Sequence, residues 1–253
     1  MDYVFSGGNV PSTPSYKDLC LSIFKGVSRQ AFLLEQMPVT QYTRIKEIRR
    51  SRGSRASGAG TPLEAIQLQQ VFDRCKLEGT VYGKRDLAII GLLYGVGLRR
   101  ADISTLRYPD NINFNDATIT VISKGDKERT IPMPDVLEAW LLDYIECRGT
   151  LPGPLIQRIR KTKDSYKLTG DKVSGQAVYN VCLKRGAEAN IERFTPHDYR
   201  RTYGTELLES GESIKDVQLL LGHTSITTTQ RYTRSRKTAD QQKQVVNNLG
   251  FGK

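Results

Sequence analysis

The stretch "RGSRASGAGT" at positions 52–61 constrains the fold most, because it divides the chain into two unequal parts. Its residues are small, polar or cationic and show no hydrophobic periodicity, a composition typical of a linker rather than of a helix or strand. We therefore predict a first segment over residues 1–51, a basic linker over 52–60 and a larger second domain over 61–253.

The first segment is predicted to be helical and small. Leu19, Ile23, Val27 and Ala31 recur at the spacing of one helix face, and a basic run, "RIKEIRRSR", follows. Residues 1–15 are rich in Gly, Ser and Pro, which predicts no regular structure there.

The second domain is predicted to be mainly helical with one small antiparallel sheet, an α+β class. Thr61 and Pro62 suit the N-cap and first position of a helix that continues through "LEAIQLQQVFDRC". Further helical patterns are "KRDLAIIGLLYGVGLRRADISTLR", "PDVLEAWLLDYIEC" and "SGQAVYNVCLKRGAEA". The alternating "ATITVISKGDKERTIPM" predicts two short strands around a Gly-Asp turn.

Charge points to an anionic partner. The chain has 38 Lys and Arg against 27 Asp and Glu, a net charge of +11, which favours nucleic acid, although a basic surface can also be merely solvated. A linker crossing a DNA backbone would use Arg52 and Arg55. No apolar run approaches the ~20 residues of a membrane span, and the start lacks the pattern of a signal peptide.

The cysteines favour reduced thiols in a cytoplasmic setting. The four of them lie far apart and form no CxxC pair, so neither a zinc site nor a disulfide framework is predicted.

The motif "TPHDYRRTYGTELLESG" begins like a capped helix. Thr195 suits the N-cap and Pro196 the first helical position, so His197 falls in the first turn. His197 and Arg200 are three residues apart, which predicts that they share one face. Gly211 is expected to end the helix. A capped surface helix with an incidental arginine fits these residues equally well.

The next motif, "ESIKDVQLLLGH", predicts a short helix that starts at a Ser213–Asp216 cap and stops at Gly222. His223 then lies just beyond the helix C-terminus. Taken alone, it is more simply a structural histidine. Tyr232 follows nine residues later, between two arginines.

Two further basic residues occupy predicted turns. Arg99 in "YGVGLRRADISTL" follows two glycines at the start of a packed helix, with Leu98, Ile103 and Leu106 facing the core. Lys124 in "ISKGDKER" lies at the tip of the predicted hairpin, where a flexible lysine can reach a ligand. Each residue alone is also compatible with an ordinary surface charge.

Together, and in this order, the motifs resemble those of the tyrosine recombinase (phage integrase) family over roughly residues 61–234, most specifically in "LLLGHTSITTTQRYTR". The resemblance implies that Tyr232 is the nucleophile and that Arg99, Lys124, His197, Arg200 and His223 complete the catalytic set. We also expect Arg100, Lys127 and Arg201 to contact DNA, together with the linker arginines Arg52 and Arg55.

The implied reaction is transesterification. Tyr232 would attack a phosphodiester, leaving a 3′-phosphotyrosyl link and a free 5′-hydroxyl, and a second 5′-hydroxyl would resolve that link without ATP. A free phenol has a pKa of ~10, so the nucleophile needs a cationic site. Planar guanidiniums suit phosphate oxygens, and a mobile lysine suits protonation of the leaving oxygen. No metal or other cofactor is expected.

The family implies a homo-tetramer that joins two double-stranded DNA sites through a four-way junction. The role would be integration, excision or resolution of a mobile element or replicon, in the cytoplasm with the nucleoid. The segment "TADQQKQVVNNLGFGK" after Tyr232 carries Val245, Val246 and Leu249, and we expect it to dock either on a neighbouring protomer or on its own.

Three departures from the family pattern stand out. Asp102 replaces the usual Glu and Tyr199 the common Leu, and both are expected to affect packing more than chemistry. The helical core-binding domain of the family is longer than the segment before this linker, which suggests a truncated or minimised form. The alternatives are a type IB topoisomerase, with the same chemistry, and a non-catalytic DNA-binding accessory protein.

Overall fold

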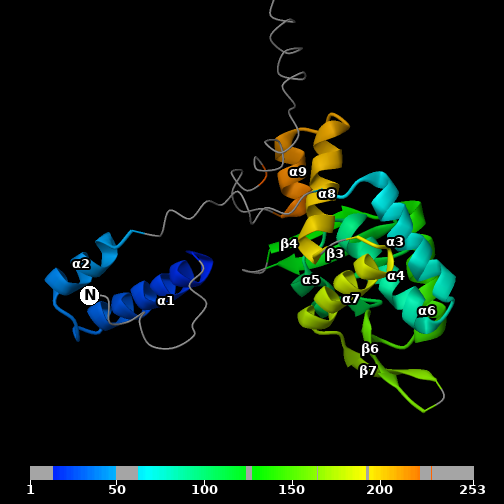
Figure 1. Ribbon diagram of the computed structural model, residues 1–253, viewed down its shortest axis with the longest axis horizontal. Coiled ribbons are helices and arrows are strands. Elements are labelled where there is room, and N and C mark those ends of the chain that lie inside the picture. The colour runs from blue at the N-terminus through cyan, green and yellow to red at the C-terminus, as the bar shows by residue number, and fades with distance from the viewer. Residues whose placement is uncertain are drawn as a thin grey trace, which may run out of the picture. The chain divides into compact units, whose positions relative to one another are not determined.

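The computed structural model describes residues 14–49, 62–123, 127–163, 165–191, 194–222 and 229. The chain forms two compact units, Met1–Ala59 and Gly60–Lys253. Each unit has its own internal packing (Figure 1). No helix among the described residues is long and apolar enough to cross a membrane.

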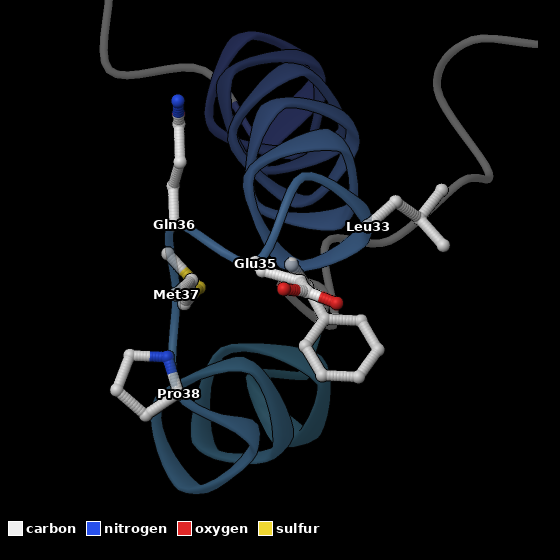
Figure 2. Close-up of a pocket in the computed structure, with 6 residues that line it drawn as sticks. Leu33, Glu35, Gln36, Met37 and Pro38 are labelled. Carbon is white, nitrogen blue, oxygen red and sulfur yellow. The ribbon is translucent and has the colours of Figure 1, made fainter.

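The first unit is a pair of helices, α1 (Pro14–Leu33) and α2 (Val39–Glu47). The rings of Phe32 and Tyr42 stack with centroids 4.6 Å apart. Lys25 Nζ donates 2.7 Å hydrogen bonds to the carbonyl oxygens of Lys46 and Ile48. The turn between the helices borders a hollow lined in part by Met37 and Pro38 (Figure 2).

The helical periodicity of this first unit correctly predicted α1, but its apolar face is not buried within the unit. Leu19, Ile23 and Val27 are 56%, 58% and 63% exposed. Two helices offer too little surface to cover such a stripe, so the segment has little core of its own.

The second unit is mainly helical with small antiparallel sheets, which confirms the predicted class. Its helices pack together, with β3 and β4 at one edge of the body and the β6–β7 hairpin projecting from it (Figure 1). The helices are α3 (Ala65–Glu78), α4 (Val81–Tyr94), α5 (Arg100–Thr105), α6 (Asp135–Arg148), α7 (Gly175–Glu188), α8 (Pro196–Glu209) and α9 (Ile214–Leu221).

The prediction of a single sheet was wrong, because the described residues form three. The predicted pair, β3 (Thr118–Ser123) and β4 (Lys127–Pro132), is joined by β2 (Ile112–Asn113). A second sheet pairs β1 (Arg107–Tyr108) with β5 (Gly153–Pro154), and a third pairs β6 (Gln157–Lys161) with β7 (Tyr166–Lys172). The strands missed are either two residues long or largely polar, so hydrophobic alternation does not reveal them.

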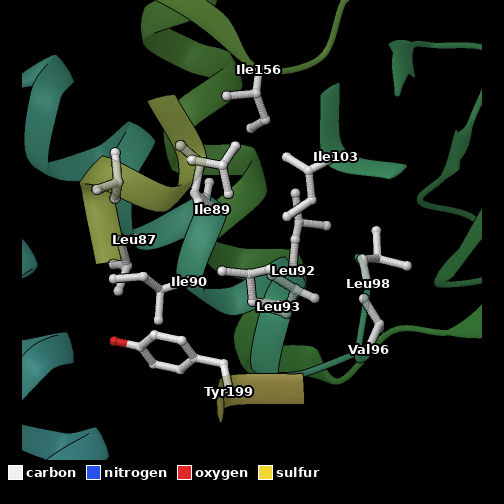
Figure 3. Close-up of a cluster of buried hydrophobic side chains, with 14 of the residues drawn as sticks. Leu87, Ile89, Ile90, Leu92, Leu93, Val96, Leu98, Ile103, Ile156 and Tyr199 are labelled. Carbon is white, nitrogen blue, oxygen red and sulfur yellow. The ribbon is translucent and has the colours of Figure 1, made fainter. Parts of the chain in front are cut away.

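Helix α4 lies at the centre of the core. Most of its residues are buried, and Ile89, Ile90, Leu92 and Leu93 are completely inaccessible to solvent. Figure 3 shows them among side chains of neighbouring elements, with the Tyr199 ring of α8 against the same cluster. The packing fixes α8 relative to α4 and to the turn that follows α4.

A buried ionic network ties α3, α4 and α7 together. Asp86 is completely buried and accepts hydrogen bonds from Arg185 Nε at 2.8 Å and from Arg85 Nη2 at 2.8 Å. Arg185 is 2% exposed and also pairs with Glu78 and Glu188. Buried charges are tolerated when they are paired and hydrogen-bonded in this way, and loss of one partner is strongly destabilising.

Local start signals predicted two helices correctly and one incorrectly. The side chain of Ser213 accepts a 3.1 Å hydrogen bond from the Asp216 N–H at the start of α9. Thr195 and Asp198 form a reciprocal capping box at α8. Helix α3, however, begins at Ala65 instead of after Thr61. The cap lies at Glu64, whose N–H donates to Gln67 Oε1 at 3.0 Å in a reciprocal capping box, while the preceding Leu63 N–H donates to Thr202 Oγ1 of α8 at 2.8 Å.

Candidate functional site

Three of the six predicted catalytic residues lie among the described residues: Arg99, His197 and Arg200. The other three, Lys124, His223 and Tyr232, lie outside them, as do the linker residues Arg52 and Arg55. Lys127 has a described backbone as the partner of Ser123 at the end of the β3–β4 hairpin.

Arg200 is held inside the protein by two backbone carbonyls. It projects from the second turn of α8 and is 3% exposed. Its Nη1 donates to the Gly97 carbonyl, and its Nη2 donates to the Leu221 carbonyl at 2.6 Å. Because Leu221 is the last residue of α9, its carbonyl has no partner within the helix, and the negative end of the helix dipole favours a cation there.

Arg99 approaches the same helix end from another direction. It is the N-cap residue of α5, and its side chain is 39% exposed. Its Nη2 donates to the Gly222 carbonyl at 2.9 Å. Thus two guanidiniums from elements far apart in sequence donate to consecutive carbonyls, those of Leu221 and Gly222, immediately before His223.

Two glycines make this convergence sterically possible. Gly97 and Gly222 have φ values of +62° and +61°, a backbone region that side chains rarely adopt. A Cβ on Gly97 would lie 2.5 Å from Tyr203 Cδ1 and 2.9 Å from Leu221 Cδ2. A Cβ on Gly222 would overlap the Arg129 guanidinium. A side chain at Gly97 would therefore press on Tyr203 and on Leu221, whose carbonyl binds Arg200, and one at Gly222 would displace the Arg129 guanidinium.

Arg129 of β4 is a site residue that sequence analysis missed. Its side chain is 12% exposed, and its Nη2 donates to Asp102 Oδ2 at 3.3 Å while the guanidinium packs on Gly222. Burial lowers the pKa of Arg129, Asp102 opposes that shift, and the nearby Arg99 adds to it. Three cationic side chains, Arg99, Arg129 and Arg200, therefore gather around the residues just before His223.

A signal for Arg129 was present in the sequence. It lies two residues from the buried Ile131 and directly opposite the buried Val121 in the strand register. Since side chains alternate between the faces of a strand, an arginine at this position must point inward. An inward arginine on an otherwise apolar face indicates a buried ionic contact.

Asp102 connects the first arginine to Arg129. Its Oδ2 accepts a 3.2 Å hydrogen bond from the Arg99 N–H and the 3.3 Å bond from Arg129, and it lies 3.9 Å from Arg99 Nη1. The expectation that Asp102 affects mainly packing therefore needs correction, because its carboxylate orients two cations. Tyr199 does serve packing: it is completely buried, and its ring lies 6.2 Å from that of Phe194.

His197 lies in the first turn of α8, as its motif predicted. His197 is exposed whereas Arg200 is buried. The three-residue spacing predicted a shared helix face, but the two residues differ in accessibility. An imidazole on the surface at a helix N-terminus is accessible to an anionic ligand.

The two neighbouring arginines behave differently. Arg100 is exposed, with its guanidinium carbon 5.8 Å from the centroid of the Tyr179 ring. Arg201 is only 6% exposed, so its guanidinium is not displayed on the surface as expected for a phosphate contact. Three-residue helical spacing from Asp198, another buried residue, places it on an inward face.

Tyr203 is the tyrosine that the described residues place beside the cations. Burial raises the pKa of its phenol, while Arg200 and Arg129 act in the opposite direction. Its ring packs against Gly97. A raised pKa disfavours the phenolate, so Tyr203 is better suited to packing than to nucleophilic attack.

Comparison with known proteins identifies relatives of the second unit. The sequence profile of the Phage integrase family matches residues 61–239. Proteins named tyrosine recombinase XerD from Staphylococcus aureus and Staphylococcus epidermidis are 35% and 34% identical over 175 residues. These matches cover 69% of this chain but only 57% of each relative, so the chain spans little more than half the length of the curated relatives it matches.

Solved structures share the fold at low sequence identity. The crystal structure of XerA recombinase aligns with a TM-score of 0.60 and 18% identity, covering 93% of this chain and 83% of that one. A lambda integrase dimer bound to a core site aligns with a TM-score of 0.63 and 17% identity, covering 88% and 75%.

Proposed function

Because the chain belongs to the phage integrase family, we propose that it is a site-specific recombinase that cleaves and rejoins DNA strands through Tyr232. The observation that carries the proposal is the meeting of Arg99 and Arg200 on the carbonyls of Gly222 and Leu221. This contact holds two cations at the end of α9, which in the sequence directly precedes His223 and lies ten residues before the proposed nucleophile.

In the proposed reaction the arginines stabilise the charge on the phosphate. Arg99 has a partly exposed guanidinium, whose planar N–H groups match the non-bridging oxygens of a phosphodiester. Arg200 is fixed on two carbonyls, so its charge needs no reorganisation as negative charge grows in the transition state. A preorganised positive field also favours the phenolate form of Tyr232.

The other proposed catalytic residues donate a proton or hydrogen-bond to the phosphate. The Tyr232 oxygen bonds to phosphorus as the bond from phosphorus to the 5′-oxygen breaks. We assign protonation of that leaving oxygen to Lys124 and hydrogen bonds to the phosphate to His197 and His223. A 5′-hydroxyl of another strand then attacks the phosphotyrosyl link and releases Tyr232, so no external energy source is needed.

Assembly belongs to the same proposal. We propose that four copies join two DNA sites on the nucleoid, with residues after Tyr232 docking between protomers. The curated relatives carry the name tyrosine recombinase, and structural neighbours include an XerH recombinase and a Tn1549 integrase in complex with DNA. These names favour strand exchange over the supercoil relaxation of a type IB topoisomerase.

Covalent capture by the unmodified protein tests the function. On nicked duplex DNA of randomised sequence, we expect a protein–DNA species that survives denaturation, is joined at the DNA 3′ end and leaves a free 5′-hydroxyl. Sequencing of the trapped DNA would then give the target. DNA binding without any trapped species would instead support an accessory protein, and relaxation of supercoiled DNA by the monomer would support a topoisomerase.

Loss of Arg129 should slow cleavage without preventing binding. In Arg129→Gln, Asp102 loses its cationic partner and Gly222 loses the guanidinium packed on it, so Arg99 is less well oriented. We expect the single-turnover cleavage rate to fall by about 10²-fold, the range for one misplaced electrostatic group, with DNA affinity changed little. Arg107→Gln, at an exposed ion pair with Asp110, is the matched control and should cleave normally. Equal cleavage rates for both variants would show that Arg129 does not contribute to catalysis.

A further inference from the structure

The β6–β7 hairpin carries a concentration of positive charge that the proposed chemistry does not use. Residues 157–172 contain six basic side chains and two acidic ones. All six basic residues are exposed, and none forms an ion pair within the described part of the chain. They are Arg158, Arg160, Lys161, Lys163, Lys167 and Lys172.

Two of these cations lie directly opposite each other. The strand register pairs Arg160 with Lys167. Like charges at opposite positions of an antiparallel pair destabilise it, so the arrangement is unfavourable unless an anion lies between or above them. No carboxylate of the described residues forms an ion pair with Arg160 or Lys167.

The opposite face of the hairpin is attached to the protein. Ile159 pairs with Leu168, and both are partly buried. The Tyr166 ring lies 5.2 Å from that of Tyr82 at the start of α4. Because side chains alternate between faces, anchoring this face leaves Arg160 and Lys167 directed outward.

Ion pairs compensate part of the cationic surface elsewhere. Elsewhere in the second unit, Lys84 pairs with Asp143, Arg107 with Asp110, and Lys184 with Glu188. Other exposed cations, such as Arg74 and Lys215, form no ion pair among the described residues. The hairpin differs because it concentrates six cations in one short segment with only two acidic residues.

The hairpin also connects directly to the site. β7 runs into α7, whose first residue, Gly175, packs beside Arg100. Arg100 adjoins Arg99 and also approaches Tyr179 of α7. Figure 1 shows the hairpin reaching outward from this helix, on the side of the body away from α9. A long anionic ligand held at Arg99 could thus extend beyond the reaction centre to meet the hairpin.

We propose that the outward face of the β6–β7 hairpin, through Arg160 and Lys167, binds the phosphate backbone of duplex DNA outside the segment being cleaved. The inference rests on the proposed function only in taking DNA as the ligand. A backbone contact of this kind adds affinity without reading sequence, because phosphates are the same at every position.

The test compares salt dependence of DNA binding. The double variant Arg160→Gln with Lys167→Gln keeps the strand but removes two charges. The double variant Arg74→Gln with Arg107→Gln removes two exposed charges elsewhere in the same unit and is the matched control. Binding to randomised-sequence duplexes of about 25 and about 60 base pairs is measured over a range of salt concentrations, since each phosphate contact contributes about 0.9 to the slope of log affinity against log salt.

On the long duplex, we expect the slope of the hairpin variant to be smaller in magnitude by about 1.8, which corresponds to two lost phosphate contacts. On the short duplex, we expect a much smaller change. Equal losses in hairpin and control variants would overturn the proposal, because they would reflect overall charge. An unchanged slope with altered self-association in sedimentation would overturn it too, by assigning the hairpin to a protein partner. Since the readout is binding, it stands apart from covalent capture, which tests the proposed function.

Discussion

Replacing Tyr232 by phenylalanine is expected to reduce covalent capture of DNA to background while leaving DNA affinity unchanged. The substitution removes one oxygen atom, the one proposed to bond to phosphorus, and keeps the ring. Because the strand break and the covalent link form in one step, a protein without its nucleophile makes neither. The measurement is a denaturing gel of nicked duplex incubated with each protein, with binding measured in parallel.

Tyr203→Phe is the matched control for that experiment. Tyr203 lies beside Arg200 and Arg129, and so it is the rival nucleophile that the described structure offers. Since burial raises the pKa of its phenol and its ring packs on Gly97, loss of the hydroxyl should leave capture intact. A trapped species that persists in Tyr232→Phe and vanishes in Tyr203→Phe would reverse the assignment of the two tyrosines.

Local signals in the sequence predicted local structure well. The Ser213–Asp216 cap, the Thr195 capping box and the β3–β4 pairing all depend on residues close together in the chain. Such contacts are encoded within a few positions of one another. Through resemblance to a family, the order of the basic motifs also predicted one shared site, and of its members Arg99 and Arg200 converge at the end of α9.

The geometry of the site was beyond these signals. That Arg99 and Arg200 donate to consecutive carbonyls depends on how α5, α8 and α9 pack, over sequence separations of 123 and 21 residues. Helical spacing suggested a shared face for His197 and Arg200, but the surrounding core buries one and exposes the other. Tertiary packing decides accessibility, and spacing alone does not.

The β6–β7 hairpin marks a second limit of sequence patterns. Its strands alternate charged residues with a few apolar ones, and Gly170 and a register shift near Gln157 interrupt the alternation. A hairpin whose hydrophobic contacts come from Tyr166 and two aliphatic residues, and whose buried Gln157 N–H donates to Tyr144 Oη, needs little hydrophobic signal. Arg129, by contrast, was predictable, because its position in β4 could be inferred from Ile131 by counting.

The conservative change Arg200→Lys should abolish most activity although it keeps the charge. A guanidinium donates to the Gly97 and Leu221 carbonyls at once, whereas an ammonium on a shorter, flexible chain cannot span both in the same plane. One buried carbonyl would lose its partner, at a cost of about 1–3 kcal/mol. The cation would also be displaced from the phosphate, and we expect cleavage to fall by about 10²- to 10³-fold.

Arg201→Lys separates that chemical effect from simple loss of stability. The two residues are adjacent on α8 and similarly buried, at 3% and 6% exposure. Both variants should show a lowered Tm, since each disturbs a buried guanidinium. Only Arg200→Lys should lose cleavage in single-turnover assays at a temperature where both remain folded. If each variant lost activity in proportion to the decrease in its Tm, Arg200 would be a structural residue. The phosphate would then have to be bound by other cations.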